Sequence, residues 1–328
     1  MGFEMFITFI QQSIRLSSTL LLGSTGEIIT EKSGNLNLGT PGIMASGAIS
    51  GIVGAYFYTV SGVAFNPIIS ILITIACCIL GSLLTTLIYC FLTITLKTNQ
   101  NVTGLALTTF GVGISNFIGS IINGKMGGTG VAAFPEIGKA YRTPLPFAEK
   151  LGVFGDIFLS YGFMTYFAIV IALVVAFVIT KTRIGLNLRA VGENPATADA
   201  AGINVGAYKY VATLIGGVIS GLGGLYYVMD FAAANWQNNI LDQFGWLSVA
   251  LVIFAVWRPN LAILGSIAFG ALYVIGPFFL GLSSKDQELL KILPYVVTIV
   301  VLVFVSIRDK KENQPPQSLG LSYFREER

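Results

Sequence analysis

The run Ile68–Leu96, IISILITIACCILGSLLTTLIYCFLTITL, contains no Asp, Glu, Lys or Arg. The charge-free stretch around it is wider still and extends from Ser33 to Leu96. A helix needs about 20 apolar residues to cross the hydrocarbon core of a membrane. The run therefore predicts a membrane-spanning helix that is long enough to tilt or to extend past the interface.

The rest of the chain has the same character. Charged residues make up 11% of the 328 residues and the mean hydropathy is +0.77, whereas soluble domains carry roughly 25% charged residues. So few charges cannot cover a folded chain of this size in water. The sequence predicts an all-α polytopic membrane protein with about nine transmembrane helices. The predicted spans are Phe6–Ile29, Ile43–Val60, Ile68–Leu96, Val102–Ile122, Ile157–Thr180, Tyr210–Met229, Phe244–Trp257, Leu261–Leu280 and Leu289–Ile307.

Basic residues in the connecting loops predict how the chain sits in the membrane. Loops on one side, with the carboxy-terminal tail, hold 12 of the 19 Lys and Arg residues, and such loops face the cytoplasm. Nine spans place the amino terminus outside and the carboxy terminus in the cytoplasm. We expect a permease-like membrane domain over residues 1–307 and a cytoplasmic tail over 308–328, part of which has the composition of an unstructured segment. Residues 123–156 form a long external loop and residues 181–209 a cytoplasmic loop.

Several kinds of chemistry are missing from the sequence. The chain has no histidine, which excludes Ser-His and Cys-His nucleophilic pairs and histidine-ligated metal sites. Cys77, Cys78 and Cys90 all lie in one apolar run and are typical of small buried hydrophobic residues. Residues 119–126 resemble a phosphate-binding loop, but Met126 stands where the motif needs Ser or Thr. The small net charge of +3 indicates no nucleic-acid partner. We expect no enzyme activity, no ATPase site, no metal and no cofactor in this chain.

The segment Glu31–Met44 is polar and glycine-rich although it lies between two predicted spans. Asn35 and Asn37 offer donors and acceptors that suit an uncharged polar cargo. Pro41 fits the first turn of the following helix. Non-helical backbone at membrane depth is tolerated only where protein buries it or where it lines a cavity. The segment is therefore either part of a transport path or an ordinary cytoplasmic loop before a helix.

Three further residues are candidates for the transport path. Glu27 is the only acid that the predicted spans place within the membrane, near the inner end of the first span, and such residues are often functional. It could equally lie at the interface, paired with Lys32 or solvated. Asn101 and Trp246 are candidates by polarity, although Trp246 also fits a residue of the aromatic belt at the membrane surface.

The cytoplasmic loop carries a second informative stretch, Arg189–Val205. Gly192 and Pro195 interrupt it, and the residues after Pro195 have the composition of a short helix with Asn194 as its N-cap. Such a helix between two spans could act as a rigid knob that receives motion from a soluble partner. The alternative is a solvated loop without a partner.

Small residues recur at helical spacing in two predicted spans. Gly47, Gly51 and Gly54 share one face of the second span, and the sixth carries a similar face. Small faces of this kind let two helices approach closely. The glycines on the second face are Gly217, Gly221 and Gly224.

Taken together, these segments resemble the nucleoside permeases of bacterial ABC importers, which are related to branched-chain amino acid and ribose permeases. The resemblance covers nearly the whole chain in order. It is carried by EKSGNLNLG at Glu31–Gly39, KTRIGLNLRAVGENP at Lys181–Pro195, AGINV at Ala201–Val205, SGLGG at Ser220–Gly224, WRP at Trp257–Pro259 and the tail Ser318–Arg328.

The resemblance implies a permease subunit in the bacterial cytoplasmic membrane. It implies as partners a cytoplasmic ABC ATPase that binds ATP and Mg²⁺, a second related permease and a substrate-binding lipoprotein or periplasmic protein. The loop with Arg189, Gly192, Glu193, Asn194, Pro195 and Gly202 would dock on the ATPase. Import of sugars or branched-chain amino acids stays open as an alternative, as does an ion-coupled secondary transporter, which usually needs an ion site near the midplane.

Overall fold

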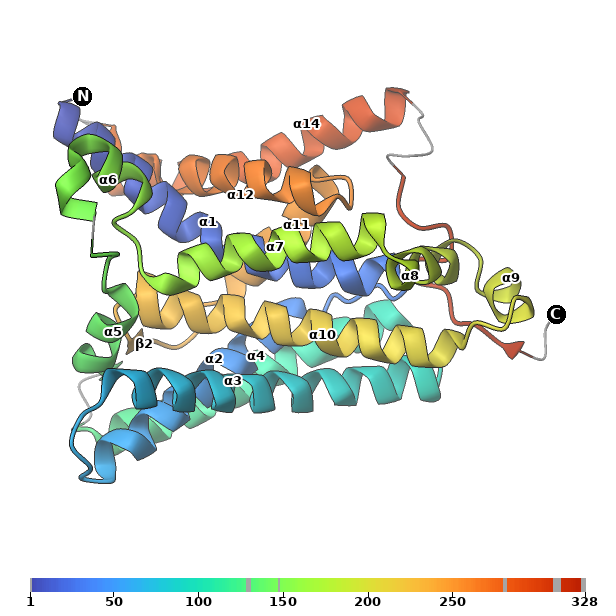
Figure 1. Ribbon diagram of the computed structural model, residues 1–328, viewed down its shortest axis with the longest axis horizontal. Coiled ribbons are helices and arrows are strands. Elements are labelled where there is room, and N and C mark those ends of the chain that lie inside the picture. Colours follow the sequence, from blue (N-terminus) through green and yellow to red (C-terminus); the bar gives the residue numbers. More distant parts are fainter. Residues whose placement is uncertain (1, 128–130, 147, 280–281, 309–313, 326–328) are drawn as a thin grey trace.

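The computed structural model describes residues 2–127, 131–146, 148–279, 282–308 and 314–325. A helix is present at each of the nine predicted positions (Figure 1). These helices are α1 (Phe3–Lys32), α2 (Thr40–Val60), α3 (Pro67–Cys90), α4 (Gln100–Lys125), α7 (Phe163–Lys181), α10 (Val205–Tyr226), α11 (Asp242–Phe254), α12 (Pro259–Val274) and α14 (Leu293–Arg308). Two of them continue as π-helical turns, η1 (Phe91–Thr95) after α3 and η3 (Tyr227–Phe231) after α10.

Six helical segments of the described chain are long and apolar enough to cross a membrane, so the protein is a multi-pass membrane protein. They are Thr40–Val60, Pro67–Thr95, Gln100–Lys125, Phe163–Lys181, Val205–Phe231 and Ser284–Phe304. Helices α11 and α12 are apolar but shorter, and α1 carries several charged residues. The count of nine spans therefore stays a prediction.

Short elements connect the long helices. At one end lie α5 (Pro135–Arg142), α6 (Gly152–Phe158) and a two-stranded antiparallel ribbon in which β1 (Ala132–Ala133) pairs with β2 (Asn235–Trp236). At the opposite end lie α8 (Arg183–Glu193) and α9 (Pro195–Ala200). The 3₁₀ turns η2 (Ala148–Leu151) and η4 (Gly276–Phe278) and helix α13 (Ser284–Leu290) complete the chain. We call the two ends the α6 end and the α9 end; the labels N and C in Figure 1 lie at these opposite ends.

Polar caps set the beginnings of several helices. Asn66 begins α3, and its Oδ1 accepts hydrogen bonds from the backbone N–H of Ile68 and Ile69 at 3.0 and 3.3 Å. Asn99 Oδ1 accepts from Val102 N at 3.1 Å before α4, and Asn204 Oδ1 accepts from Ala207 N at 3.0 Å before α10. Each cap satisfies a helix N–H that has no partner within the helix, which places these ends at defined residues.

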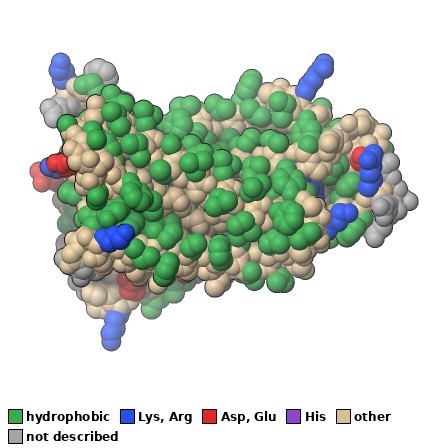
Figure 2. All heavy atoms as spheres, turned by 90° about the horizontal axis from the view of Figure 1, so that it is seen from below, with side chains coloured by type: hydrophobic (Ala, Val, Ile, Leu, Met, Phe, Trp, Pro, Cys, Tyr) green, Lys and Arg blue, Asp and Glu red, His purple; other side chains and the backbone are tan. Residues whose placement is uncertain are grey.

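Helices α1 and α10 form the centre of the molecule. From Leu16 to Glu31 every residue of α1 is buried, and α1 packs on α7, α10, α11 and α12. Around this centre, α3 and α14 are only partly covered by the rest of the chain: within the 18-residue apolar window of each span, 28% of the residues in the α3 span and 11% in the span that includes α14 are buried. Figure 2 shows hydrophobic side chains along the length of one face, with charged ones mostly near the two ends. Exposed apolar surface of this kind suits contact with lipid.

The two predicted small-residue faces meet in the structure. A Cβ atom on Gly47 of α2 would lie 2.8 Å from the Cα of Gly221 on α10, too close for any real contact. Helices α1 and α10 approach as closely, since a Cβ on Gly216 would collide with the carbonyl oxygen of Gly26. The predicted role of small residues in close packing is thus confirmed for α2 and α10.

This packing leads to a stability prediction. Replacement of Gly216 by alanine is expected to destabilise the protein by about 1–3 kcal/mol, because helix backbones must shift to accept the methyl group. Gly113→Ala is the matched control, since its Cβ would meet nothing within 4 Å; alanine there should be neutral or stabilise by up to about 1 kcal/mol. Unfolding of the purified protein in a denaturing detergent, followed by fluorescence, measures both. Equal stability of the two variants would contradict the close approach.

Candidate transport path and coupling end

The segment Ser33–Gly39 between α1 and α2, here called the buried segment, is non-helical and enclosed by protein. Its Ser33, Asn35 and Asn37 side chains are 0–2% exposed. This position contradicts the alternative of an ordinary cytoplasmic loop. Non-helical backbone is stable here only if its polar groups find partners within the protein.

Three neighbouring helices supply those partners. Gln100 Oε1 of α4 accepts from Leu36 N at 2.7 Å, and the Tyr89 hydroxyl of α3 donates to Leu36 O at 2.5 Å. Thr108 Oγ1 of α4 donates to Leu38 O at 2.7 Å. On α10, Thr213 Oγ1 accepts from Asn35 Nδ2 at 3.1 Å. Helix movements would therefore be transmitted to this segment through hydrogen bonds.

Glu27 of α1 holds the end of the buried segment that leads into α2. Its carboxylate is 1% exposed and accepts from Asn37 N at 3.2 Å and from the Thr40 hydroxyl at 2.5 Å. Glu27 is therefore not solvated, and no ion pair joins it to Lys32 among the described residues. The Asn37 side chain also bonds within the segment, since its Oδ1 accepts from Gly39 N at 3.0 Å.

Asn35 differs from Asn37 because its side-chain oxygen, Oδ1, accepts no hydrogen bond from a described residue. That atom is nevertheless buried. The side chain lines a cavity of about 210 Å³ at the α9 end. Of the predicted path residues, the structure brings together Asn35, Asn37 and Glu27. Asn101 is exposed on the first turn of α4 and Trp246 is half-buried on α11, and neither belongs to this set of hydrogen bonds among the described residues.

A second buried acid escaped the sequence analysis. Glu31, one turn after Glu27, is 3% exposed and accepts a short hydrogen bond from the indole N–H of Trp257. Helix α1 thus carries two buried acids, of which the sequence analysis singled out Glu27 alone. Trp257 lies between α11 and α12 in a left-handed backbone conformation, φ 54°. The WRP sequence at Trp257–Pro259 gave no signal of this contact.

The contact with Glu31 predicts unequal effects of two tryptophan substitutions. Trp257→Phe should destabilise the protein by about 1–3 kcal/mol more than Trp236→Phe, because it leaves a buried carboxylate without its donor. Trp236 is also buried, but its Nε1 has no hydrogen-bond partner among the described residues. Detergent unfolding of both variants measures the difference. A larger loss in Trp236→Phe would show that the hydrogen bond contributes little.

A third buried acid, after Glu27 and Glu31, lies at the α6 end. Asp230, in the π turn η3, is 1% exposed, and the predicted sixth span stopped one residue before it. Arg142 of α5 donates to the carbonyls of Asp230 and Phe231 at 2.5 and 2.7 Å. Burial and the nearby Arg15 guanidinium lower the pKa of Arg142, while Asp230 opposes them. The contacts tie α5 to the end of α10.

The predicted coupling loop is more helical than expected. The short helix after Asn194 is confirmed as α9, with Asn194 Oδ1 accepting from Thr197 N at 3.0 Å and Pro195 in the first turn. The residues before it, including Arg189 and Glu193, belong to a further helix, α8. The loop also ends earlier than predicted, since α10 begins at Val205 and contains Lys209.

Helix α9 offers a short projection of small side chains. Its inner side is held by an apolar cluster of Val191, Ala198 and Val205. Its outer residues Ala196, Thr197 and Ala200 are exposed, as are Glu193, Asn194, Ala201 and Gly202. Gly192 is buried where a Cβ would collide with the carbonyl of Lys32. Helix α8, which leads into the projection, is thus packed directly against the end of α1.

The described part of the tail, Gln314–Arg325, has no α-helix but is folded against the α9 end. Ser318 N donates to Gly192 O at 3.0 Å and Gly320 N to Gly34 O at 3.2 Å. The Tyr323 hydroxyl donates to Asp199 Oδ2 at 2.8 Å, and Arg325 Nε lies 3.2 Å from the same oxygen. The tail therefore joins α9 to the buried segment.

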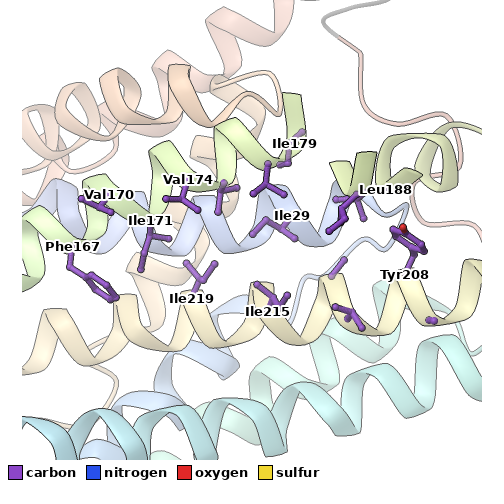
Figure 3. A pocket seen from close by; sticks show the side chains of 16 residues that line it. Ile29, Phe167, Val170, Ile171, Val174, Ile179, Leu188, Tyr208, Ile215 and Ile219 are labelled. Atoms are coloured by element: carbon purple, nitrogen blue, oxygen red, sulfur yellow. The ribbon is translucent and has the colours of Figure 1, made fainter. Parts of the chain in front are cut away.

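A larger cavity, of about 650 Å³, is unsuited to polar cargo. It lies between α7 and α10 with Ile29 of α1 at its floor (Figure 3). Its labelled lining residues are aliphatic or aromatic, and the Tyr208 hydroxyl already accepts from Asn187 Nδ2 at 2.9 Å. A sugar or nucleoside would lose its hydrogen bonds to water there without replacement.

Comparison with known proteins gives a consistent result. The model of a family described as "Branched-chain amino acid transport system / permease component" matches residues 9–302. A putative glucose ABC transporter permease of Haloferax volcanii is 32% identical over 96% of each chain. A nucleoside ABC transporter permease of Lactococcus lactis is 33% identical over 87% of this chain and 88% of its own length. A guanosine ABC transporter permease of Bacillus subtilis is 30% identical over 95% of each chain. No solved structure matches.

Proposed function

We propose that this chain, which belongs to the family of permease components of branched-chain amino acid transport systems, imports nucleosides. The chain is the membrane-spanning permease subunit of an ABC transporter, a transport component rather than an enzyme. The main support for nucleoside cargo is similarity along most of the chain to two relatives named for nucleosides and guanosine. A sugar is the second candidate, because a relative of similar identity is named for glucose.

The proposed subunit works with partners. A cytoplasmic ABC ATPase would dock on the projection formed by α8 and α9. A second related permease and a substrate-binding lipoprotein would complete the importer in the bacterial cytoplasmic membrane. We propose nine spans with the α9 end in the cytoplasm, which is supported by the excess of Lys and Arg in loops at that end.

The proposed mechanism links the ATPase to the buried segment. Movement of α9 would reach the segment through Gly192 and the tail, which contact Gly34 and Lys32. Asn35, with its free amide oxygen, is the residue of the segment best placed to contact an uncharged polar cargo. The proposed path needs no charged cargo ligand, since Glu27 and Glu31 already have partners within the chain.

Uptake of labelled inosine by whole cells tests the cargo. Deletion of this gene alone should abolish uptake, and a plasmid copy should restore it. Excess unlabelled guanosine should compete, whereas glucose and leucine should not. Unchanged inosine uptake in the deletion strain contradicts the proposal, and loss of glucose uptake in its place would favour the sugar alternative.

A further inference from the structure

The cavity of about 210 Å³ at the α9 end has an unusual lining. It lies between the buried segment, the end of α3, the beginning of α10 and the tail. Three of its side chains are cationic and, within the described part of the chain, none is acidic. The lining residues are Asn35, Thr93, Ile94, Lys97, Gln100, Val205, Gly206, Lys209, Ser322, Tyr323 and Arg325.

Lys209 is the central feature of this cavity. It is 4% exposed and lies in the second turn of α10. Among the described residues it forms no hydrogen bond and no ion pair. An ammonium group withdrawn from water without a counter-charge is costly, so an anion that enters the cavity would recover part of this cost.

The other polar groups distinguish the kind of anion. Lys97 lies at the rim with its Nζ 4.2 Å from the ring centre of Phe324 and makes no ion pair within the described chain. Arg325 is different, because Asp199 neutralises it. Two unpaired ammonium groups match the charge of about −1.5 to −2 on a phosphate monoester at neutral pH, a group found in free phosphate monoesters and in phosphatidic acid. Lysine binds phosphate as a point charge.

We propose that this cavity binds a phosphate group, held by Lys209 and Lys97. The group comes either from a free phosphate or phosphate monoester in the cytoplasm or from the phosphomonoester headgroup of phosphatidic acid, an anionic lipid. Ser322 and Tyr323 of the tail line the cavity, and Tyr323 also bonds to Asp199 of α9. Binding would therefore stabilise the docked tail and, through it, the position of α9. The effect on transport rests on the proposed function, but phosphate binding does not.

Equilibrium dialysis with radiolabelled inorganic phosphate tests the site. The full-length chain is purified without the ATPase, so that nucleotide sites do not contribute, and is placed in nanodiscs of phosphatidylcholine. The wild type should bind phosphate saturably. Lys209→Met, which keeps the length of the side chain but not its charge, should weaken binding by about tenfold or more, and Lys97→Met should weaken it less.

Two variants serve as controls. Lys181→Met removes an exposed cation at the end of α7 that does not line the cavity, and it should bind phosphate as the wild type does. Lys209→Arg restores the charge and should recover binding, which separates loss of the charge from damage to the fold. Equal binding by the wild type and Lys209→Met would overturn the proposal for free phosphate.

Nanodiscs that contain phosphatidic acid distinguish the lipid source. If the headgroup occupies the cavity, native mass spectrometry should find phosphatidic acid retained on the wild type but not on Lys209→Met. The absence of both saturable phosphate binding and Lys209-dependent lipid retention would overturn the inference. Inosine uptake is not measured in any of these assays, so their failure is separate from a failure of the proposed cargo.

Discussion

Glu27→Ala is expected to reduce nucleoside uptake about tenfold or more and to lower the stability of the protein by about 2–4 kcal/mol. The carboxylate is the acceptor for the buried N–H of Asn37 and for the Thr40 hydroxyl. Without it the Asn37 N–H has no partner, since water cannot replace the acceptor inside the packed helices. The turn that carries the buried segment would then lose its fixed position. Inosine uptake and detergent unfolding measure the two effects.

Two variants make this result specific. Glu27→Gln retains an oxygen for Asn37 N, while the Thr40 hydroxyl can still donate to Asn37 O, 3.1 Å away; it should keep most of the stability. Glu4→Ala removes an exposed carboxylate from the same helix and should leave both measurements unchanged. Wild-type uptake by Glu27→Ala would show that the anchor is not needed.

Ala200→Arg on the exposed side of α9 is expected to prevent docking of the ATPase and to reduce uptake about tenfold or more. A long charged side chain in place of a methyl group would separate the two docked surfaces and would bury an unpaired charge. The folded chain itself should be little affected, with a stability change within about 0.5 kcal/mol, because Ala200 is exposed. Co-purification of the ATPase with the tagged chain measures docking.

The matched control for this prediction carries the same side chain at the other end of the molecule. Glu136 is exposed on α5, at the α6 end, so Glu136→Arg should leave ATPase co-purification unchanged. Normal co-purification and uptake in Ala200→Arg would exclude α9 as the docking element. Normal co-purification with lost uptake would instead place the effect in the transmission of motion.

The sequence located features that depend on neighbouring residues alone. Apolar runs placed a helix at each of the nine predicted positions, and Asn194 with Pro195 gave the beginning of α9, because a cap bonds within its own first turn. The glycine faces of α2 and α10 were also visible, since helical spacing groups them on one side. For the path, the polar segment with Asn35 and Asn37 was located, but whether it was buried was left open.

The tertiary structure decided which distant groups meet. Glu31 and Trp257 are 226 positions apart in the chain, and neither residue carries a local pattern that announces the other. The docking of Ser318 on Gly192 and the burial of Lys209 beside Asn35 are of the same kind. The charge-free runs thus determined that this is a membrane protein of many helices, because burial of backbone in lipid requires helices. Only the packing of those helices decided that the polar segment lies inside the protein, where α3, α4 and α10 supply its hydrogen bonds.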